Sequence, residues 1–307
     1  MRVGAIDQGT NTTRLLVADV VDGQVNALSR RSIITRLGEG VDSRHRLLPL
    51  PIARVRNALS EYRRELESLG TERALLVATS AVRDAENGEA FLGEIEWSYG
   101  FTTRLLTGDE EAAMTLRGVG GLADGTILID IGGGSTELTR ASGRVSTDLG
   151  SVRMTERFLP SDPPTSDELR SLSDAIRAVL SEHDFAAERG MGVAGTVTSL
   201  AALDLSLVEY DSDKVDGHRL SEGAVESQLD RLAALPLAER REVPGLEPER
   251  APVIVAGAAI LLETMRYLGL DEIEVSERDI LDGAALEAAE LPEPVEGDAP
   301  PGAYTCC

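Results

Sequence analysis

The stretch LIDIGGGSTEL, residues 128–138, decides the fold class. Its apolar beginning has the composition of a buried strand, and this strand ends at Asp130. Three consecutive glycines follow, namely Gly132, Gly133 and Gly134. Glycine lets the backbone approach a ligand closely and turn its N–H groups toward it, so such a turn binds phosphate well. The stretch therefore predicts a strand that ends in an anion-binding turn.

The polar side chains of the same stretch extend its chemistry. Ser135 and Thr136 add hydroxyl donors beside the glycines, and Glu137 follows Asp130 by seven positions. Because Mg²⁺ and Mn²⁺ prefer oxygen ligands, this pair of acids can hold a divalent cation. The alternative is a plain glycine hairpin in a surface sheet, which a single glycine-rich turn would favour.

A second copy of the pattern lies near the N-terminus, in VGAIDQGTNTTRLLVAD, residues 3–19. With a shift of 123 positions, Asp7 aligns with Asp130 and Gly9 with Gly132. Thr10, Asn11 and Thr12 align with the next three residues of the later turn. Each copy then continues through a strand to a turn signal and another strand. A duplicated plain hairpin would not need to keep its aspartate, so the repeat favours two ligand-binding turns.

The repeat predicts an α/β protein made of two similar domains with a cleft between them. Helical and strand patterns alternate along the rest of the chain. Helices are expected at residues 51–69, 89–99, 109–119, 166–183, 196–203, 221–234 and 248–268, and further strands at 74–78, 102–106, 191–194 and 272–275. The expected domains are residues 1–123 and 124–291. Residues 292–307 are acidic and proline-rich and are expected to form a flexible tail.

Composition restricts the class of function. The 307 residues carry a net charge of −23, which argues against nucleic acid as a partner because neutralising phosphates requires a basic face. No apolar run is long enough to span a bilayer, and the N-terminus has no signal-peptide pattern, so we expect a cytoplasmic protein with no membrane partner. The two cysteines end the chain and the three histidines are scattered, which disfavours zinc sites and histidine-based catalysis.

Two further segments carry residues suited to phosphate chemistry. In GVAGTVTSLAAL, residues 192–203, Gly195 and Thr196 stand where a strand leads into a helix, whose N-terminus can bind an anion. In ATSAVRDA, residues 78–85, Arg83 follows a strand end. Arginine at such a point suits phosphate, although a surface ion pair with Asp84 or Glu86 is the ordinary interpretation.

A pair of glutamates opens the helix expected at residues 109–119. In TGDEEAAM, residues 107–114, Thr107 and Glu110 fit a capping box. That structural role accounts for one of the two glutamates. The other can orient or deprotonate a water molecule that attacks a phosphoryl group.

Six motifs occur in order along the chain: AIDQGTNTTRLLVAD, ATSAVRDA, TGDEEAA, LIDIGGGSTEL, VAGTVTSLAAL and SERDILDGAAL. Together they resemble the exopolyphosphatase and guanosine pentaphosphate phosphohydrolase family, part of the actin, sugar kinase and heat-shock ATPase superfamily. The resemblance covers nearly the whole chain and implies a duplicated actin-like, ribonuclease H-like fold. The implied reaction is hydrolysis of the terminal phosphoanhydride bond of inorganic polyphosphate, which releases orthophosphate.

The resemblance also implies roles for individual residues. Glu111 would be the catalytic carboxylate that activates water, and Asp130 and Glu137 would hold Mg²⁺ or Mn²⁺. Arg83 and Arg14 would neutralise the scissile end of the substrate. The residues implied to bind substrate phosphates are Asp7, Gly9, Thr10, Asn11, Arg14, Arg83, Gly132, Gly133, Gly134, Ser135, Gly195 and Thr196.

The implied partners are inorganic polyphosphate and a second copy of the chain in a homodimer. Long family members carry a C-terminal helical extension, and its absence here implies a preference for short polyphosphates. Polyphosphate and this protein are both anionic, but residues 1–60 hold nine arginines against five acids. We therefore expect a basic N-terminal lobe, with Arg30, Arg31 and Arg36, to meet the polyanion.

Three alternatives stay open. The same fold could remove the 5′ phosphate of guanosine pentaphosphate to give guanosine tetraphosphate, since that substrate presents the same kind of terminal bond. A non-catalytic sensor of polyphosphate or of guanosine tetraphosphate is the second alternative. The joint presence of Glu111, Asp130 and Glu137 argues against it, because a sensor needs no water-activating acid. The third is a kinase-like user of ATP, for which an adenosine pocket cannot be recognised in the sequence.

Overall fold

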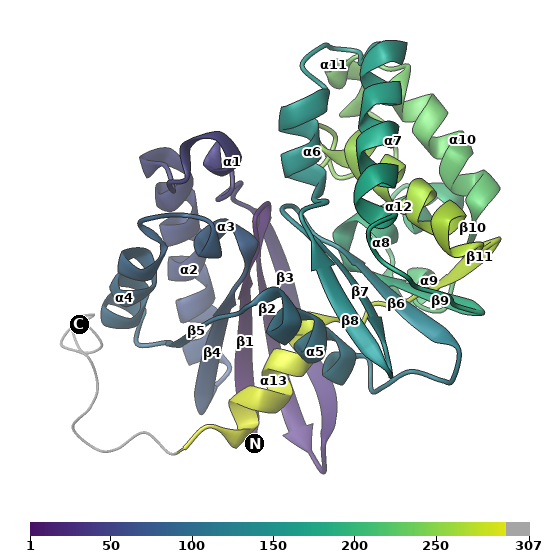
Figure 1. Ribbon diagram of the computed structural model, residues 1–307. Helices are drawn as coiled ribbons and strands as arrows, with labels where there is room; N and C mark the ends of the chain where they lie inside the picture. The colour runs from purple at the N-terminus through teal and green to yellow at the C-terminus, as the bar shows by residue number, and fades with distance from the viewer. Residues whose placement is uncertain (293–307) are drawn as a thin grey trace. The chain divides into compact units, whose positions relative to one another are not determined.

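The computed structural model describes residues 1–292, which form two compact units (Figure 1). Of the described residues, the first unit contains Met1–Gly118 and 280–292, and the second contains Val119–Asp279. Each unit is built on one mixed β-sheet that carries helices. The prediction of an α/β protein with two similar halves is confirmed.

The sheet of the first unit has the strand order β3-β2-β1-β4-β5. Its first three strands form an antiparallel meander, and β4 and β5 continue the sheet parallel to β1. The strands are β1 (Arg2–Gln8), β2 (Thr12–Val21), β3 (Gln24–Ile34), β4 (Arg73–Ala78) and β5 (Thr102–Leu105). The helices are α1 (Val41–Arg44), α2 (Pro49–Ser68), α3 (Ser80–Arg83), α4 (Gly88–Tyr99), α5 (Gly108–Gly118) and α13 (Ile280–Glu290).

Alternate residues of β1 enter two different hydrophobic clusters, as the period of two in a strand requires. Ile6 belongs to a cluster with residues of α2 and α4, such as Leu59 and Phe91. Ala5 belongs to a second cluster that contains Met114 of α5 and residues of α13. Helices therefore cover both faces of this sheet (Figure 1).

The second unit repeats this plan with the strand order β10-β11-β9-β6-β7-β8. Its strands are β6 (Thr126–Ile131), β7 (Thr136–Arg140), β8 (Gly143–Thr147), β9 (Arg189–Val193), β10 (Arg219–Ser221) and β11 (Glu272–Val275). Its helices are α6 (Ser151–Phe158), α7 (Ser166–Leu180), α8 (Ala194–Asp204), α9 (Ser212–Val215), α10 (Glu222–Ala233), α11 (Leu237–Arg240) and α12 (Ile254–Leu268).

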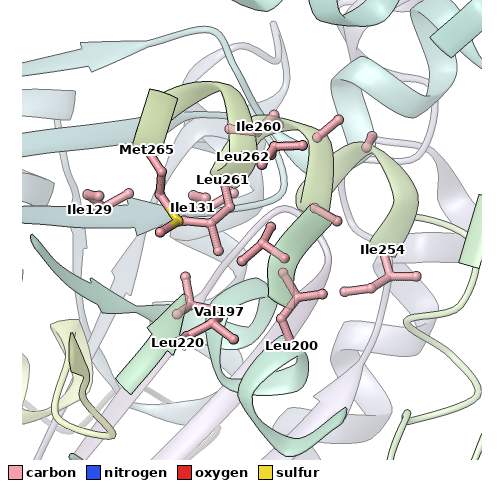
Figure 2. Packing of buried hydrophobic residues seen from close by; sticks show 14 of the residues in the cluster. Ile129, Ile131, Val197, Leu200, Leu220, Ile254, Ile260, Leu261, Leu262 and Met265 are labelled. Carbon is pink, nitrogen blue, oxygen red and sulfur yellow. The ribbon is translucent and has the colours of Figure 1, made fainter. Parts of the chain in front are cut away.

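Helix α12 lies at the centre of the large core of the second unit. Almost all of its residues are buried, which fits its near-continuous apolar sequence. Figure 2 shows Ile260 and Met265 of this helix with Ile129 of β6 and Leu200 of α8, all members of one cluster. Aliphatic side chains build this core, as the low aromatic content predicts.

The order β3-β2-β1-β4-β5 in one unit corresponds strand for strand to β8-β7-β6-β9-β11 in the other. The register keeps the same correspondence: Asp7 pairs with Arg14 across β1 and β2, and Asp130 pairs with Glu137 across β6 and β7. Both pairs differ by the shift of 123 positions found in the sequence. The duplication predicted from the sequence is thus confirmed at the level of single residue pairs.

The division of the chain differs from the expected boundaries in one main respect. Residues 280–290, expected in the second domain and not predicted to be helical, form helix α13 and pack in the first unit against α5 and β1. Gly283 makes the contact possible, because a Cβ atom there would lie 2.0 Å from the carbonyl oxygen of Met114. Arg104 also forms an ion pair with Glu287 of α13 at 2.6 Å. The local sequence of α13 carries no sign of which sheet it joins.

Smaller differences concern the ends of elements. The first unit ends at Gly118, close to the expected boundary at residue 123. Helix α12 begins at Ile254 rather than at residue 248, because residues 248–253 form turns. Residues 293–307 of the predicted tail lie outside the described part of the chain. Within residues 1–292, every helix is too short or too polar to cross a lipid bilayer.

Candidate active site

The predicted site residues of the first unit follow the ends of its three parallel strands. The turn at Gly9–Asn11 follows β1, α3 with Arg83 follows β4, and α5 with Glu111 follows β5. Parallel strands have their carboxyl ends at the same edge of a sheet, which is where open α/β sheets bind ligands. The fold thus brings these three segments to one edge of the first unit.

The carbonyl groups of the first turn are all bound by donors from the first unit itself. The Gly9 oxygen accepts from Gln8 Nε2 at 3.1 Å, and the Thr10 oxygen accepts from the Gly38 N–H at 2.8 Å. The Asn11 oxygen accepts from the Thr35 N–H at 3.0 Å. A carbonyl and the N–H of the next residue point in opposite directions on one trans peptide plane. The N–H groups of Thr10 and Asn11 therefore point away from these donors, as an anion site requires.

The second turn has the same arrangement. The Gly132 oxygen accepts from the Ser151 N–H at 3.0 Å, and the Gly133 oxygen accepts from the Arg153 N–H at 3.2 Å. The guanidinium of Arg153 donates from Nε to the Gly134 oxygen at 2.8 Å. By the same peptide geometry, the N–H groups that follow these carbonyls point away from α6. The two turns related by the repeat thus both direct consecutive N–H groups outward.

Gly150, which precedes α6, permits this close packing of α6 on the second turn. A Cβ atom at Gly150 would lie 2.3 Å from the Gly134 Cα and from the Gly133 oxygen. Backbone atoms cannot rotate out of the way as a side chain can. Only glycine at this position is compatible with the observed turn.

Both copies of the repeat carry an aspartate at the end of their first strand, but the residue that faces it differs between the two units. Asp7 faces Arg14, whose Nη2 lies 2.7 Å from Asp7 Oδ2. Asp130 instead faces Glu137, which is buried and accepts a hydrogen bond from Ser146 Oγ at 2.6 Å. Side chains directly opposite in an antiparallel pair share one face, with Cβ atoms about 5 Å apart. The second unit therefore brings two buried carboxylates together where the first has an ion pair.

This acid pair fits a divalent cation only with further ligands. In the described part of the chain, no group of three or more histidine, cysteine or acidic side chains has metal-ligand geometry. Mg²⁺ commonly binds one or two protein carboxylates and completes its shell with water and phosphate oxygens. Asp130 and Glu137 are suitable donors for such a site.

The structure assigns different environments to the two adjacent glutamates. Glu110 forms the capping box: its Oε2 accepts from the Thr107 N–H at 2.9 Å, and its N–H donates to Thr107 Oγ1 at 3.3 Å. The hydrogen bond from the Thr107 backbone, aided by Arg104, lowers the pKa of Glu110 to about 2. Glu111 is the buried member of the pair. The capping box is confirmed, and it leaves Glu111 without that structural task.

Arg83 lies next to Glu111. Its Nη1 donates to the Leu106 oxygen at 2.7 Å and lies 3.5 Å from Glu111 Oε2. The ordinary interpretation, an ion pair with Asp84 or Glu86, does not describe this geometry. The bond to Leu106 fixes the guanidinium at the end of β5, beside the predicted catalytic carboxylate.

The third candidate turn, after β9, lies near the start of α6, which holds the second turn. A Cβ atom at Gly257 of α12 would lie 2.7 Å from Thr196 Cγ2 and 3.5 Å from the Ser151 Cβ, so Gly257 lets these residues meet. Ala194 adopts a left-handed backbone with φ of 66°, a strained conformation for a residue with a side chain. Thr196 and the start of α6 thus lie close together.

Sequence reasoning missed several side chains that shape these turns. The guanidinium of Arg250 lies on Gly195, where an added Cβ would be 2.0 Å from Arg250 Nη1. Ser80 Oγ lies 2.7 Å from Thr10 Oγ1 and joins α3 to the first turn. Arg153 and Gln8 bind turn carbonyls. The adjacency of Gly195 and Arg250 cannot be read from local pattern, whereas Arg153, soon after Gly150, could have been noticed.

Two of the three arginines expected to meet the polyanion form ion pairs with acidic residues of the first unit. Arg30 Nη2 binds the buried Asp282 at 2.7 Å, and Arg31 Nε lies 3.9 Å from Glu65 Oε2. Arg36 is next to Thr35, whose N–H donates to the first turn, and the backbone of Arg36 is left-handed with φ of 50°. Of the three arginines, Arg30 has a structural role in docking α13.

Known proteins resemble this chain over almost its whole length. Residues 16–290 match the model of the Ppx/GppA phosphatase family. The chain belongs to this family. It is 38% identical to Exopolyphosphatase 2 of Mycobacterium tuberculosis, over 94% of this chain and 98% of that protein. The resemblance drawn from the six motifs is confirmed.

Two further relatives of this Ppx/GppA family member carry names that refer to different substrates. A solved exopolyphosphatase-like protein has a TM-score of 0.87 and 32% identity, covering 94% of this chain and 99% of that one. The guanosine-5′-triphosphate,3′-diphosphate pyrophosphatase of Vibrio atlanticus is 27% identical over 92% of this chain and 58% of its own length. The family therefore includes relatives named for both substrates that the sequence left open.

Proposed function

We propose that this protein is an exopolyphosphatase, a hydrolase that cleaves the terminal phosphoanhydride bond of inorganic polyphosphate and releases orthophosphate. The observation that carries the proposal is the geometry of the two turns. Each holds consecutive carbonyls inward and directs consecutive N–H groups outward, as repeated phosphate groups require. The chain is 38% identical to an exopolyphosphatase over 94% of its own length and 98% of that protein, which supports the same substrate.

In this proposal Glu111 is the general base. Its carboxylate accepts a proton from the water molecule that attacks the terminal phosphorus, and the leaving group is the shortened polyphosphate. Arg83, held beside Glu111 by the Leu106 oxygen, stabilises negative charge on the phosphoryl oxygens. Phosphoryl transfer needs little covalent assistance, so positioning and electrostatic stabilisation supply most of the catalysis.

Asp130 and Glu137 would hold Mg²⁺, or alternatively Mn²⁺. Like charges directly opposite in an antiparallel pair destabilise the sheet, and a divalent cation would offset that repulsion. When bound, the metal would supply positive charge for the phosphate oxygens. Its presence can be tested without turnover, because Mg²⁺ should raise the melting temperature of the wild type more than that of Glu137→Gln.

A second candidate function is removal of the 5′ phosphate of guanosine pentaphosphate. The similarity to the Vibrio atlanticus pyrophosphatase favours it, although that relative is less similar and much longer. Turns that recognise phosphates through backbone N–H groups do not distinguish the two substrates. A homodimer and a cytoplasmic location, both expected from the resemblance or the composition, stay predictions that sedimentation and fractionation can test.

The test is orthophosphate release in Mg²⁺ from three substrates: short polyphosphate, long polyphosphate and guanosine pentaphosphate. Glu111→Gln is compared with Glu110→Gln, a matched control because glutamine preserves a capping box. The proposal predicts rapid release from polyphosphate, lost in Glu111→Gln and kept in Glu110→Gln. Release from the nucleotide alone would assign the second function. Binding without any release would mean a sensor.

A further inference from the structure

We propose that Gln8 is a positioning residue that orients the first phosphate turn, an inference that rests on the exopolyphosphatase proposal. Gln8 is the last residue of β1 and is fully buried. In the second unit, the corresponding residue is the apolar Ile131, which lies in the hydrophobic core. A buried amide costs free energy unless both its ends are hydrogen-bonded. The packing of the strand alone would therefore be served better by an aliphatic side chain.

Both ends of the Gln8 amide are bound. Nε2 donates to the Gly9 carbonyl oxygen at 3.1 Å, and Oε1 accepts from Thr13 Oγ1 at 2.8 Å. Thr13 is the register partner of Gln8 on β2, and its hydroxyl also lies 2.9 Å from Thr35 Oγ1. Because the Gly9 carbonyl can only accept, the amide has one orientation that satisfies it. Thr13 and Thr35 hold the amide in that orientation.

The two turns differ in the group that donates a hydrogen bond to their first carbonyl, that of Gly9 or Gly132. Its counterpart, the Gly132 carbonyl, accepts from the backbone N–H of Ser151 at the start of α6. In the described chain, residues 35–40, which follow β3 as α6 follows β8, form no helix, and the Gly9 carbonyl accepts from the side chain of Gln8 instead. The Gly9 oxygen and the Thr10 N–H belong to the same peptide plane. Gln8 therefore sets the direction in which the Thr10 N–H meets a phosphate.

The experiment measures the dissociation constant of tripolyphosphate by calorimetry, in the Glu111→Gln background so that the probe is not hydrolysed. Gln8→Met keeps the length of the side chain but removes both hydrogen bonds. Thr13→Val keeps the donor to Gly9 and removes the hydroxyl that orients it. The matched control is Thr71→Val, since Thr71 Oγ1 is buried and has no hydrogen-bond partner within the described chain.

The inference predicts that Gln8→Met weakens tripolyphosphate binding about fivefold to tenfold. A misdirected hydrogen bond keeps part of its strength, whereas full loss of a hydrogen bond to a charged group would cost more than about tenfold. Thr13→Val should weaken it about twofold to fivefold, and Thr71→Val should leave it unchanged. Melting temperatures are measured in parallel to separate affinity from folding.

Unchanged affinity in Gln8→Met, with a lowered melting temperature, would overturn the inference and make Gln8 a packing residue only. If Gln8→Met does not fold, unchanged affinity in Thr13→Val overturns it equally. These outcomes are distinct from a failure of the proposed function. In that case the background protein itself would bind no tripolyphosphate, which would contradict both the exopolyphosphatase assignment and the role of Gln8.

Discussion

Replacing Gly150 by alanine should disable the second turn while the fold persists. The added methyl carbon would lie 2.3 Å from the Gly134 Cα and the Gly133 oxygen, whereas ordinary contacts begin near 3.4 Å. The turn and the start of α6 must therefore move apart by about 1 Å. A displacement of that size at a site that positions substrate costs about 100-fold in rate. Overpacking of this kind costs about 1–3 kcal/mol in stability.

The assay is the steady-state rate of orthophosphate release from polyphosphate, with thermal unfolding measured on the same samples. Gly143→Ala is the matched control, because Gly143 lies in the adjoining strand β8 and an added Cβ there meets nothing within 4 Å. We expect kcat/KM to fall about 100-fold in Gly150→Ala and to change less than about twofold in Gly143→Ala.

Wild-type kcat/KM in a folded Gly150→Ala protein would refute the reasoning. It would mean that the second turn tolerates a shift of about 1 Å and does not position the substrate. Equal losses in both alanine variants would refute it as well, since the effect would then come from the hairpin as a whole.

Three further predictions follow from single residues. Glu111→Gln should lower kcat about 10²-fold to 10⁴-fold with little change in KM, measured by steady-state kinetics, because it removes the base. Glu110→Ala should cost about 1 kcal/mol of stability at pH 7, as lost caps do, and leave kcat nearly unchanged. Because the folded-state pKa of Glu110 is lowered to about 2, that stability should be present above about pH 4.3 and vanish as the pH falls toward 2, which urea unfolding across this range can check. Ala194→Gly should raise the free energy of unfolding by about 0.5–1 kcal/mol, because glycine adopts the left-handed φ of 66° without strain. Denaturant unfolding measures this change, and a decrease would contradict the prediction.

Much of the fold could be predicted because the sequence repeats itself. The shift of 123 positions predicted the strands, turn and hairpin of both meanders. The structure adds the register partners of Asp7 and Asp130, which are Arg14 and Glu137. The expected helices and strands lie within a few residues of those observed, apart from α12, because period and capping signals are local. The capping box at Thr107 and Glu110 is one such signal.

The rest depends on contacts between distant parts of the chain. Arg250 lies on Gly195, and Gly283 lies against Met114, although both pairs are far apart in sequence. Helix α13 therefore joins the first unit for a reason that its own pattern does not contain. The hydrogen bonds of Gln8 could not be predicted either, because a lone glutamine at a strand end has many ordinary explanations.

The most direct test of the central claim compares polyphosphate with unmodified ends and the same polyphosphate with both ends blocked by esterification. We expect orthophosphate to be released only from unmodified chains, one unit at a time, and Glu111→Gln to abolish this release. Cleavage of end-blocked chains into shorter polyphosphates, or release from unmodified chains that survives in Glu111→Gln, would contradict it.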